Sequence, residues 1–228
     1  AGYPTMDLSE MDPARIEAFQ AQDRYLQERC PETLVLTYAM HWPGRQRETA
    51  RGLRRTPFYH ALKAKGAVYT EMQGWERPSW FAPDGVAPVH DYAFGRPSWF
   101  DHAQAEQKSA REGVVMIDYS MLGKHMVEGK DAENFLQRVS TNDVSIDDGR
   151  VIYSLMLNDR GGIEGDVTIA RHDKTRFMIM SAISHTRRNR DHLKRAILAN
   201  EDVIIRDVTS AYAVLALSGP LSRAVLET

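Results

Sequence analysis

Short apolar runs separated by polar turns fill the second half of the chain and predict a sheet. The runs are rich in β-branched and aromatic residues and are bounded by glycine or polar turn residues, which is typical of strands. They lie at residues 114–117, 122–128, 151–158, 163–169, 177–181, 203–205 and 213–217. Gly161-Gly162 and residues 172–175 turn consecutive runs back on each other, so three of these strands form an antiparallel meander.

Helical patterns lie between these runs and before them. Asp12-Pro13 is a cap followed by a first-turn proline, so residues 12–29 are expected to form a helix that ends at Arg29. Residues 34–36 are a strand candidate, and the rest of residues 30–91 is expected to be irregular. Further helices are expected at residues 98–111, 131–139, 184–199 and after Pro220. The fold class is therefore α+β, with a largely antiparallel sheet and flanking helices.

The composition is typical of a soluble chain and limits the kinds of binding partner that are expected. Of the 228 residues, 43% are hydrophobic and 26% are charged, and no apolar run reaches membrane length. The net charge of -2 gives no electrostatic reason to expect nucleic acid or a membrane surface as a partner. Cys30 is the only cysteine, which excludes an internal disulfide and favours a reducing compartment. We expect a cytoplasmic protein, or a mitochondrial matrix protein in a eukaryote.

The hairpin around Gly161-Gly162 carries the candidate site. If these glycines form a two-residue turn, Leu157 lies opposite Asp166, and Tyr153 lies about 13 Å further along its strand. Period-two alternation then places one carboxylate on a face with apolar and aromatic residues, namely Tyr153, Leu155, Leu157, Asp166 and Thr168. A buried carboxylate needs a polar partner, and a bound ligand could supply one. The alternative, which the residues alone favour, is that Asp166 is exposed to solvent near the turn.

Other patterns support structural roles more than chemistry. Residues 74–81 hold two tryptophans and a phenylalanine, which could bind a ligand but more commonly pack a connecting segment onto a domain. The basic helix at residues 184–199 reads as a solvated face, and the histidines show no metal-ligand spacing, so we predict no metal site. No Gly-rich phosphate-binding motif and no nucleophile motif occurs.

Taken together, the motifs resemble those of sarcosine and dimethylglycine dehydrogenases, flavoproteins whose amine-oxidising domain precedes a folate domain similar to the glycine-cleavage aminomethyltransferase. The resemblance rests on the middle segment with Gly74-Trp75-Glu76-Arg77-Pro78, on residues 118–132, and on the hairpin of residues 153–168. It implies that residues 1–29 end an FAD-dependent amine oxidase domain, residues 30–90 form a connector, and residues 91–228 begin the folate domain. Ala1 in place of methionine, and the stop soon after Pro220, lead us to expect a piece of a longer protein.

The resemblance also assigns roles to individual residues. It makes Asp166 the catalytic carboxylate beside the reactive folate nitrogens, and it places Tyr153, Thr168, Leu122 and Met121 around the bound cofactor. The implied cofactors are tetrahydrofolate and FAD, with FAD held mainly by residues upstream of this chain. The flavin fingerprint and the family's later Tyr-Thr-Gly-Glu-like folate motif are both absent from this sequence. We therefore expect the chain alone to be inactive, with an incomplete folate pocket.

The implied function is oxidation of an N-methyl amine, with transfer of the oxidised methyl carbon to tetrahydrofolate as methylenetetrahydrofolate. One alternative is a non-catalytic homologue that acts as a regulatory or interaction subunit, against which Asp166 argues weakly. Another is a stand-alone aminomethyltransferase, which would leave residues 2–81 without explanation. Small molecules, a methylated amine and folate, are the expected partners; the identity of the amine and the oligomeric state stay open, and an oligomer is possible.

Overall fold

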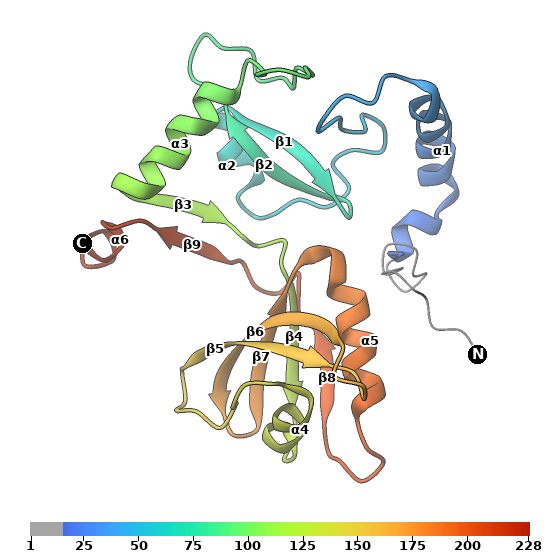
Figure 1. Ribbon diagram of the computed structural model, residues 1–228, viewed down its shortest axis with the longest axis vertical. Helices are drawn as coiled ribbons and strands as arrows, with labels where there is room; N and C mark the ends of the chain where they lie inside the picture. The colour runs from blue at the N-terminus through green and yellow to red at the C-terminus, as the bar shows by residue number, and fades with distance from the viewer. Residues whose placement is uncertain (1–15) are drawn as a thin grey trace. The chain divides into compact units, whose positions relative to one another are not determined.

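The computed structural model describes residues 16–228 and divides the chain into two units (Figure 1). Residues 122–212, with residues 16–18 of the described chain, form one unit, and residues 19–121 together with residues 213–228 form the other. Residues 16–228 form three sheets, and all strand pairs in them are antiparallel, which confirms the predicted α+β class. None of the described helices is long and apolar enough to span a membrane.

A five-stranded sheet forms the unit of residues 122–212, with the order β5-β6-β7-β4-β8. Its strands are β4 (Gly123–Glu128), β5 (Val151–Leu157), β6 (Ile163–Asp173), β7 (Arg176–Ser181) and β8 (Ile204–Asp207). Its helices are α4 (Ala132–Val139), the short η4 (Ile183–His185) and α5 (Thr186–Ala196). Each of the strands and helices predicted here from the apolar runs is present, and the last helix ends three residues early because the chain turns extended at Ile197.

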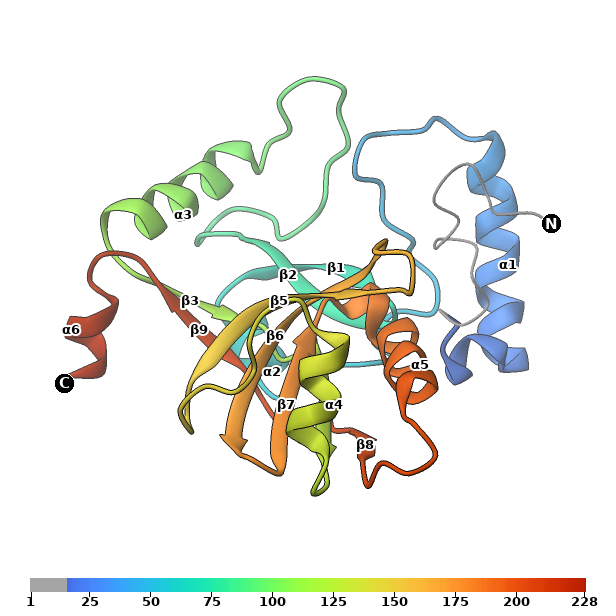
Figure 2. The same cartoon turned by 60° about the horizontal axis from the view of Figure 1, so that its bottom comes forward.

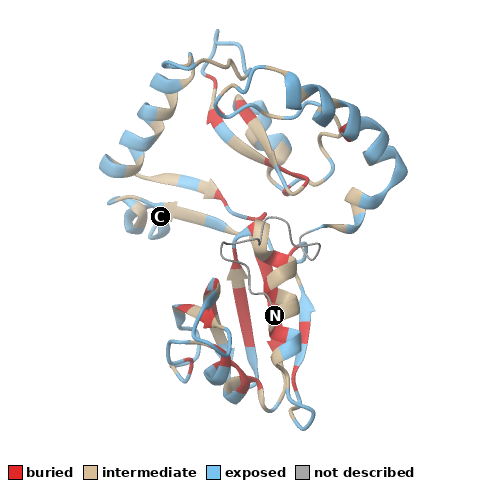
Figure 3. Ribbon diagram, turned by 45° about the vertical axis from the view of Figure 1, so that its right-hand side comes forward, coloured by how far each residue is buried: buried red, intermediate tan, exposed pale blue. Residues whose placement is uncertain are grey.

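The core of this unit lies on one face of the sheet, where α4 and α5 pack (Figure 2). Phe135 and Leu136 of α4 and Leu193 of α5 are fully buried against Phe177 and Ile179 of β7. Each such side chain contributes roughly 1.5–3 kcal/mol when it leaves water. Strand β4 is buried along almost its whole length, as Figure 3 shows.

A histidine without a hydrogen-bond partner lies in this core. His125 of β4 is fully buried, and neither ring nitrogen has a partner among the described residues. Burial lowers the pKa of His125 from 6.5 to about 4; Asp207 on β8 opposes the shift, while Arg190 and Lys194 on α5 add to it. At neutral pH the imidazole is therefore uncharged.

We expect His125 to make this unit sensitive to acid. The unfolded chain binds a proton near pH 6.5 and the folded chain only near pH 4, so stability is lost as the pH falls through that window. The loss amounts to about 3 kcal/mol, which the variant His125→Gln should not show. Urea unfolding followed by far-ultraviolet circular dichroism at pH 7.5 and pH 4.5 measures the difference. An equal pH dependence in variant and parent would contradict the assignment.

The second unit is discontinuous in sequence. It contains η3 (Ala18–Ala21), α1 (Asp23–Tyr38), α2 (Tyr59–Ala64), β1 (Ala67–Met72), β2 (Trp75–Phe81), α3 (Phe100–Glu112), β3 (Val115–Asp118), β9 (Leu215–Ser218) and α6 (Ser222–Leu226). Strands β1 and β2 form a hairpin, and β3 pairs with β9. The unit that contains β1–β3 is thus completed by a segment about a hundred residues later in the chain.

The structure corrects the prediction for residues 16–38. The part of the predicted helix at residues 12–15 lies outside the described residues. In place of one helix, the structure has η3 and then α1, separated by the extended residue Gln22. Helix α1 continues past Arg29 to Tyr38, so the strand predicted at residues 34–36 is wrong. Side chains on one helix face explain the difference: Arg29 donates to the Thr49 carbonyl at 2.8 Å, and Glu32 accepts the Glu48 amide at 2.6 Å. These tertiary contacts hold the helix although Pro31 lies inside it.

The connector predicted to be irregular contains a hairpin. Strands β1 and β2 meet at a two-residue turn in which Gln73 and Gly74 both have positive φ, 51° and 78°. Two consecutive positive φ values are typical of the hairpin turns that match strand twist. The sequence did not predict this hairpin, because Pro78 lies inside β2 and proline usually argues against a strand.

Candidate functional site

The hairpin of β5 and β6 places the predicted catalytic residue on the sheet face opposite to α4 and α5. Leu155 pairs with Asp166 and Tyr153 pairs with Thr168, and all four side chains share this face. Five residues, 158–162, separate the strands, with Asn158 N–H bonded to the Gly162 carbonyl at 2.9 Å, and the register shifts at a bulge between Met156 and Leu157. The predicted pairing of Leu157 with Asp166 is therefore wrong by two residues. The predicted face is correct for the other four residues, but Leu157 lies beyond the bulge and lines a cavity with Arg138 of α4 and His192 of α5.

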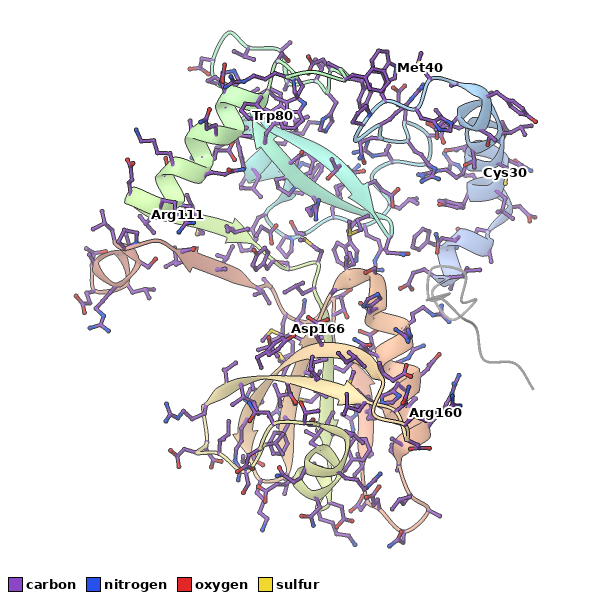
Figure 4. The ribbon with its side chains drawn as sticks, viewed as in Figure 1. Cys30, Met40, Trp80, Arg111, Arg160 and Asp166 are labelled. Carbon is purple, nitrogen blue, oxygen red and sulfur yellow. The ribbon has the colours of Figure 1, made fainter. Side chains whose placement is uncertain are left out.

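The corrected register brings the candidate ligand-binding groups closer together. Tyr153 lies two residues from Leu155, so it is a diagonal neighbour of Asp166, about 7 Å along the strand instead of about 13 Å. Asp166 is exposed, and its carboxylate makes no hydrogen bond or ion pair with residues 16–228. Figure 4 labels this side chain on β6. A ligand of modest size could contact both side chains at once.

Further residues on the same face were not predicted from the sequence. Thr168 pairs with Met180 of β7, which pairs with Lys124 of β4, so one row of side chains crosses four strands from Tyr153. The next row contains Met178 and Met126, both buried. Methionine packs well against flat rings because its thioether is flexible and polarizable. The sequence signal was the period-two spacing of these methionines and Lys124 within the two predicted strands.

Helix α5 fixes the strand just before Asp166. Arg188 donates to the Glu164 carbonyl at 3.0 Å and to the Glu164 carboxylate at 2.8 Å, and Asn158 donates to the other carboxylate oxygen at 2.9 Å. Gly165 has no room for a side chain, because a Cβ atom there would lie 2.7 Å from the amide oxygen of Asn189. The backbone leading into Asp166 is therefore held from two sides.

The two remaining candidate cofactor residues lie where the two units join in sequence. Leu122 is half-buried, and its carbonyl accepts a hydrogen bond from Lys124 Nζ at 2.8 Å. Met121 is buried and belongs to the other unit, where it lines a cavity with Asp118 and Tyr119. The structure thus groups Asp166, Tyr153 and Thr168 on one face, and the placement of Leu122 and Met121 around a cofactor stays a prediction.

The aromatic octapeptide has the packing role that the sequence favoured. Trp75 and Trp80 are buried, and Trp80, labelled on β2 in Figure 4, stacks on His102 of α3 with ring centroids 5.6 Å apart. Glu76 is buried between Arg51 and the amide of Gly52. Among the described residues, no group of three potential metal ligands comes together.

Comparisons with protein families assign both parts of the sequence. The GCVT N-terminal domain matches residues 58–228, and the central domain of FAD-dependent oxidoreductases matches residues 1–56. The glycine cleavage aminomethyltransferase T of Bartonella henselae has a similar structure, with a TM-score of 0.60 and 25% identity over 77% of this chain and 43% of that chain.

Several curated relatives match most or nearly all of the chain. The 4-methylaminobutanoate oxidase (formaldehyde-forming) of Paenarthrobacter nicotinovorans is 40% identical over 99% of this chain and 27% of its own length. The mouse pyruvate dehydrogenase phosphatase regulatory subunit is 34% identical over 99% of the chain and 26% of its length. Human sarcosine dehydrogenase is 31% identical over 75% of the chain and 21% of its length.

The chain therefore spans about a quarter of the length of these relatives. The matched residues include the hairpin of β5 and β6 and the segment around Glu76, which carry the resemblance seen in the sequence. The chain belongs to the family of the glycine-cleavage T-like aminomethyltransferase domain, joined as in sarcosine and dimethylglycine dehydrogenases to the central domain of an FAD-dependent oxidoreductase.

Proposed function

We propose that this chain is the one-carbon-accepting part of an FAD-dependent enzyme that oxidises an N-methyl amino acid and passes the methyl carbon to tetrahydrofolate. The observation that carries the proposal is the sheet face on which Asp166, without a partner among residues 16–228, neighbours Tyr153 and Thr168. Leu155 and Met180 add apolar contact area beside them.

The residues of this face fit a folate. A flat ring system can pack on the phenol of Tyr153 and the thioether of Met180, while its amine N–H groups need an acceptor. The Asp166 carboxylate offers that acceptor. FAD would be held mainly by residues beyond these, because this sequence has no Gly-rich phosphate-binding motif.

Bound FAD would supply the oxidation, taking a hydride from the N-methyl group and leaving an iminium. In the step assigned to this chain, Asp166 orients the folate amine towards the iminium carbon and accepts its proton as the new C–N bond forms. A second folate nitrogen then displaces the substrate amine from that carbon. Both folate protons end on the released amine, so the products are methylenetetrahydrofolate and the demethylated amino acid.

The proposed substrate class follows from the relatives, whose names give 4-methylaminobutanoate, sarcosine and dimethylglycine. Each of these compounds has a carboxylate and an N-methylated amine. The FAD-dependent oxidoreductase match over residues 1–56 favours this function over a stand-alone aminomethyltransferase. A regulatory subunit is the second candidate, because one such relative is 34% identical to the chain.

The complete protein, incubated anaerobically with each N-methyl amino acid, tests the proposal. We expect the flavin absorbance to bleach with at least one of them. Formaldehyde should accumulate without tetrahydrofolate and be replaced by methylenetetrahydrofolate in its presence. A flavin that no N-methyl amino acid reduces would favour the regulatory subunit, and a formaldehyde yield unaffected by tetrahydrofolate would remove the transfer step.

A further inference from the structure

A cavity of about 570 Å³ lies in the unit of residues 19–121, apart from the residues discussed above as a folate site. The loop before α2, the helix α2 itself, strand β1 and residues 88–92 line it. Three of its lining side chains are cations, Arg51, Arg55 and Lys63. The charge balance of the lining side chains decides what the cavity can hold.

One of the three cations is already neutralised. Arg51 donates to both carboxylate oxygens of Glu76, at 2.9 and 2.5 Å, and the amide of Gly52 donates to the same carboxylate at 2.7 Å. Glu76 is 3% exposed, so this pair is fully engaged. Its oxygens are not available to a ligand, and the pair adds no net charge to the cavity.

The other two cations lie over one aromatic ring. The Arg55 guanidinium carbon is 4.8 Å from the centroid of Tyr59, and Lys63 Nζ is 5.9 Å from it. Neither cation forms a salt bridge within residues 16–228. The remaining acidic side chain of the lining, Glu48, is exposed. Two cations near one ring repel each other. The Glu76 carboxylate, on which the charge of Arg55 also acts, is already bonded to Arg51, so a bound anion would relieve that repulsion.

Two neutral side chains beside the cations, Tyr92 and His90, differ in what they can offer a ligand. The Tyr92 hydroxyl accepts the Gln46 amide at 3.0 Å, which leaves its proton to donate. His90 Nε2 is buried without a partner in the described part of the chain, and burial lowers the pKa of this imidazole, so it is neutral at pH 7. A neutral imidazole has one N–H, and that of His90 is directed to the Tyr69 backbone, so Nε2 carries a lone pair and supplies no donor to an anion.

We propose that this cavity binds a small oxyanion, a carboxylate or a phosphate, between Arg55 and Lys63. The planar guanidinium matches such a group with two parallel hydrogen bonds, and the ammonium adds a point charge. The Arg55 guanidinium lies close against Gly52, where an added Cβ atom would be 2.6 Å from Nη2. The site needs neither flavin nor folate and is independent of the proposed function.

Calorimetric titration of the 228-residue chain at low salt with inorganic phosphate, and separately with citrate, tests the site. We expect binding of at least one anion, weakened about tenfold by Arg55→Gln and by Lys63→Gln. Arg223→Gln removes an exposed cation of the same unit outside the cavity and should leave the affinity unchanged. Binding of phosphate alone or of citrate alone identifies the source of the oxyanion.

Two further measurements test the site without removing a charge from the chain. Gly52→Ala keeps every charge but crowds the Arg55 guanidinium and strains the backbone at a φ of 74°, so it should weaken binding by a similar factor. In the unaltered chain, the anion should shift the ring proton resonances of His90 and leave those of His41, outside the cavity, in place. The absence of binding by both anions, equal affinities of Arg55→Gln and the parent, or an unshifted His90 would each overturn the proposal.

Discussion

Methylenetetrahydrofolate formation by the complete protein should fall about 100-fold or more when Asp166 is replaced by alanine, because the folate amine loses its proton acceptor. The rate of flavin reduction by the N-methyl amino acid should not change, since Asp166 has no part in the oxidation. Free formaldehyde should rise as the iminium hydrolyses instead of reacting with folate. Stopped-flow absorbance and product analysis measure the two steps separately.

A control on the same hairpin separates chemistry from charge. Asp159 is exposed in the turn between β5 and β6, so Asp159→Ala removes an equal charge without touching the proposed site. This variant should form methylenetetrahydrofolate at the parent rate. Unchanged folate product in Asp166→Ala would remove Asp166 from the mechanism, whereas an equal loss in both variants would point to a general effect of charge on the hairpin.

The second large effect concerns stability. Although burial alone would raise the pKa of the Glu76 carboxyl, hydrogen bonds from Arg51 and Gly52 hold the pKa below its ordinary value. Glu76→Ala leaves the guanidinium of Arg51 and an amide without their partner, which should lower the free energy of unfolding by about 3 kcal/mol. Glu76 and all four tryptophans, at positions 42, 75, 80 and 99, belong to the unit of residues 19–121 and 213–228, so tryptophan fluorescence reports the unfolding of that unit.

A surface ion pair gives the matched comparison. Arg24 and Glu28 pair on α1 with exposed fractions of 91% and 42%, so Arg24→Ala should cost less than about 0.5 kcal/mol in the same urea titration. Equal costs for Glu76→Ala and Arg24→Ala would show that the buried carboxylate is not a structural centre of this unit.

The period of the apolar pattern was enough to predict the sheet face of the candidate site, but not its register. Tyr153, Leu155, Asp166 and Thr168 share a face under any turn of even length, because side chains alternate strictly along a strand. The pairing of Leu155 with Asp166 depends on a five-residue turn together with the bulge at Leu157, and Gly161-Gly162 suits a shorter turn equally well. The distance between Tyr153 and Asp166 could therefore be obtained only from the structure.

Tertiary contacts explain the larger errors. Residues 34–36 have strand propensity, but Arg29 and Glu32 bind the loop at residues 48–50 from the same helix and extend it to Tyr38. The partnership of β3 with β9 joins residues 115–118 to residues 215–218, a distance along the chain at which no local pattern carries information. Both cases show long-range contacts overriding local preference.

The insertion of residues 122–212 into the other unit has a consequence for biosynthesis. All strands of the five-stranded sheet lie within residues 122–212, and β4 near the start of this segment pairs with β8 near its end, so the whole sheet is available once residue 212 has left the ribosome. The host unit still lacks β9 at that moment. During translation, residues 122–212 should therefore fold before the unit that surrounds them in sequence. In nascent chains, the segment that contains Asp166 should gain protease resistance before β3 pairs with β9.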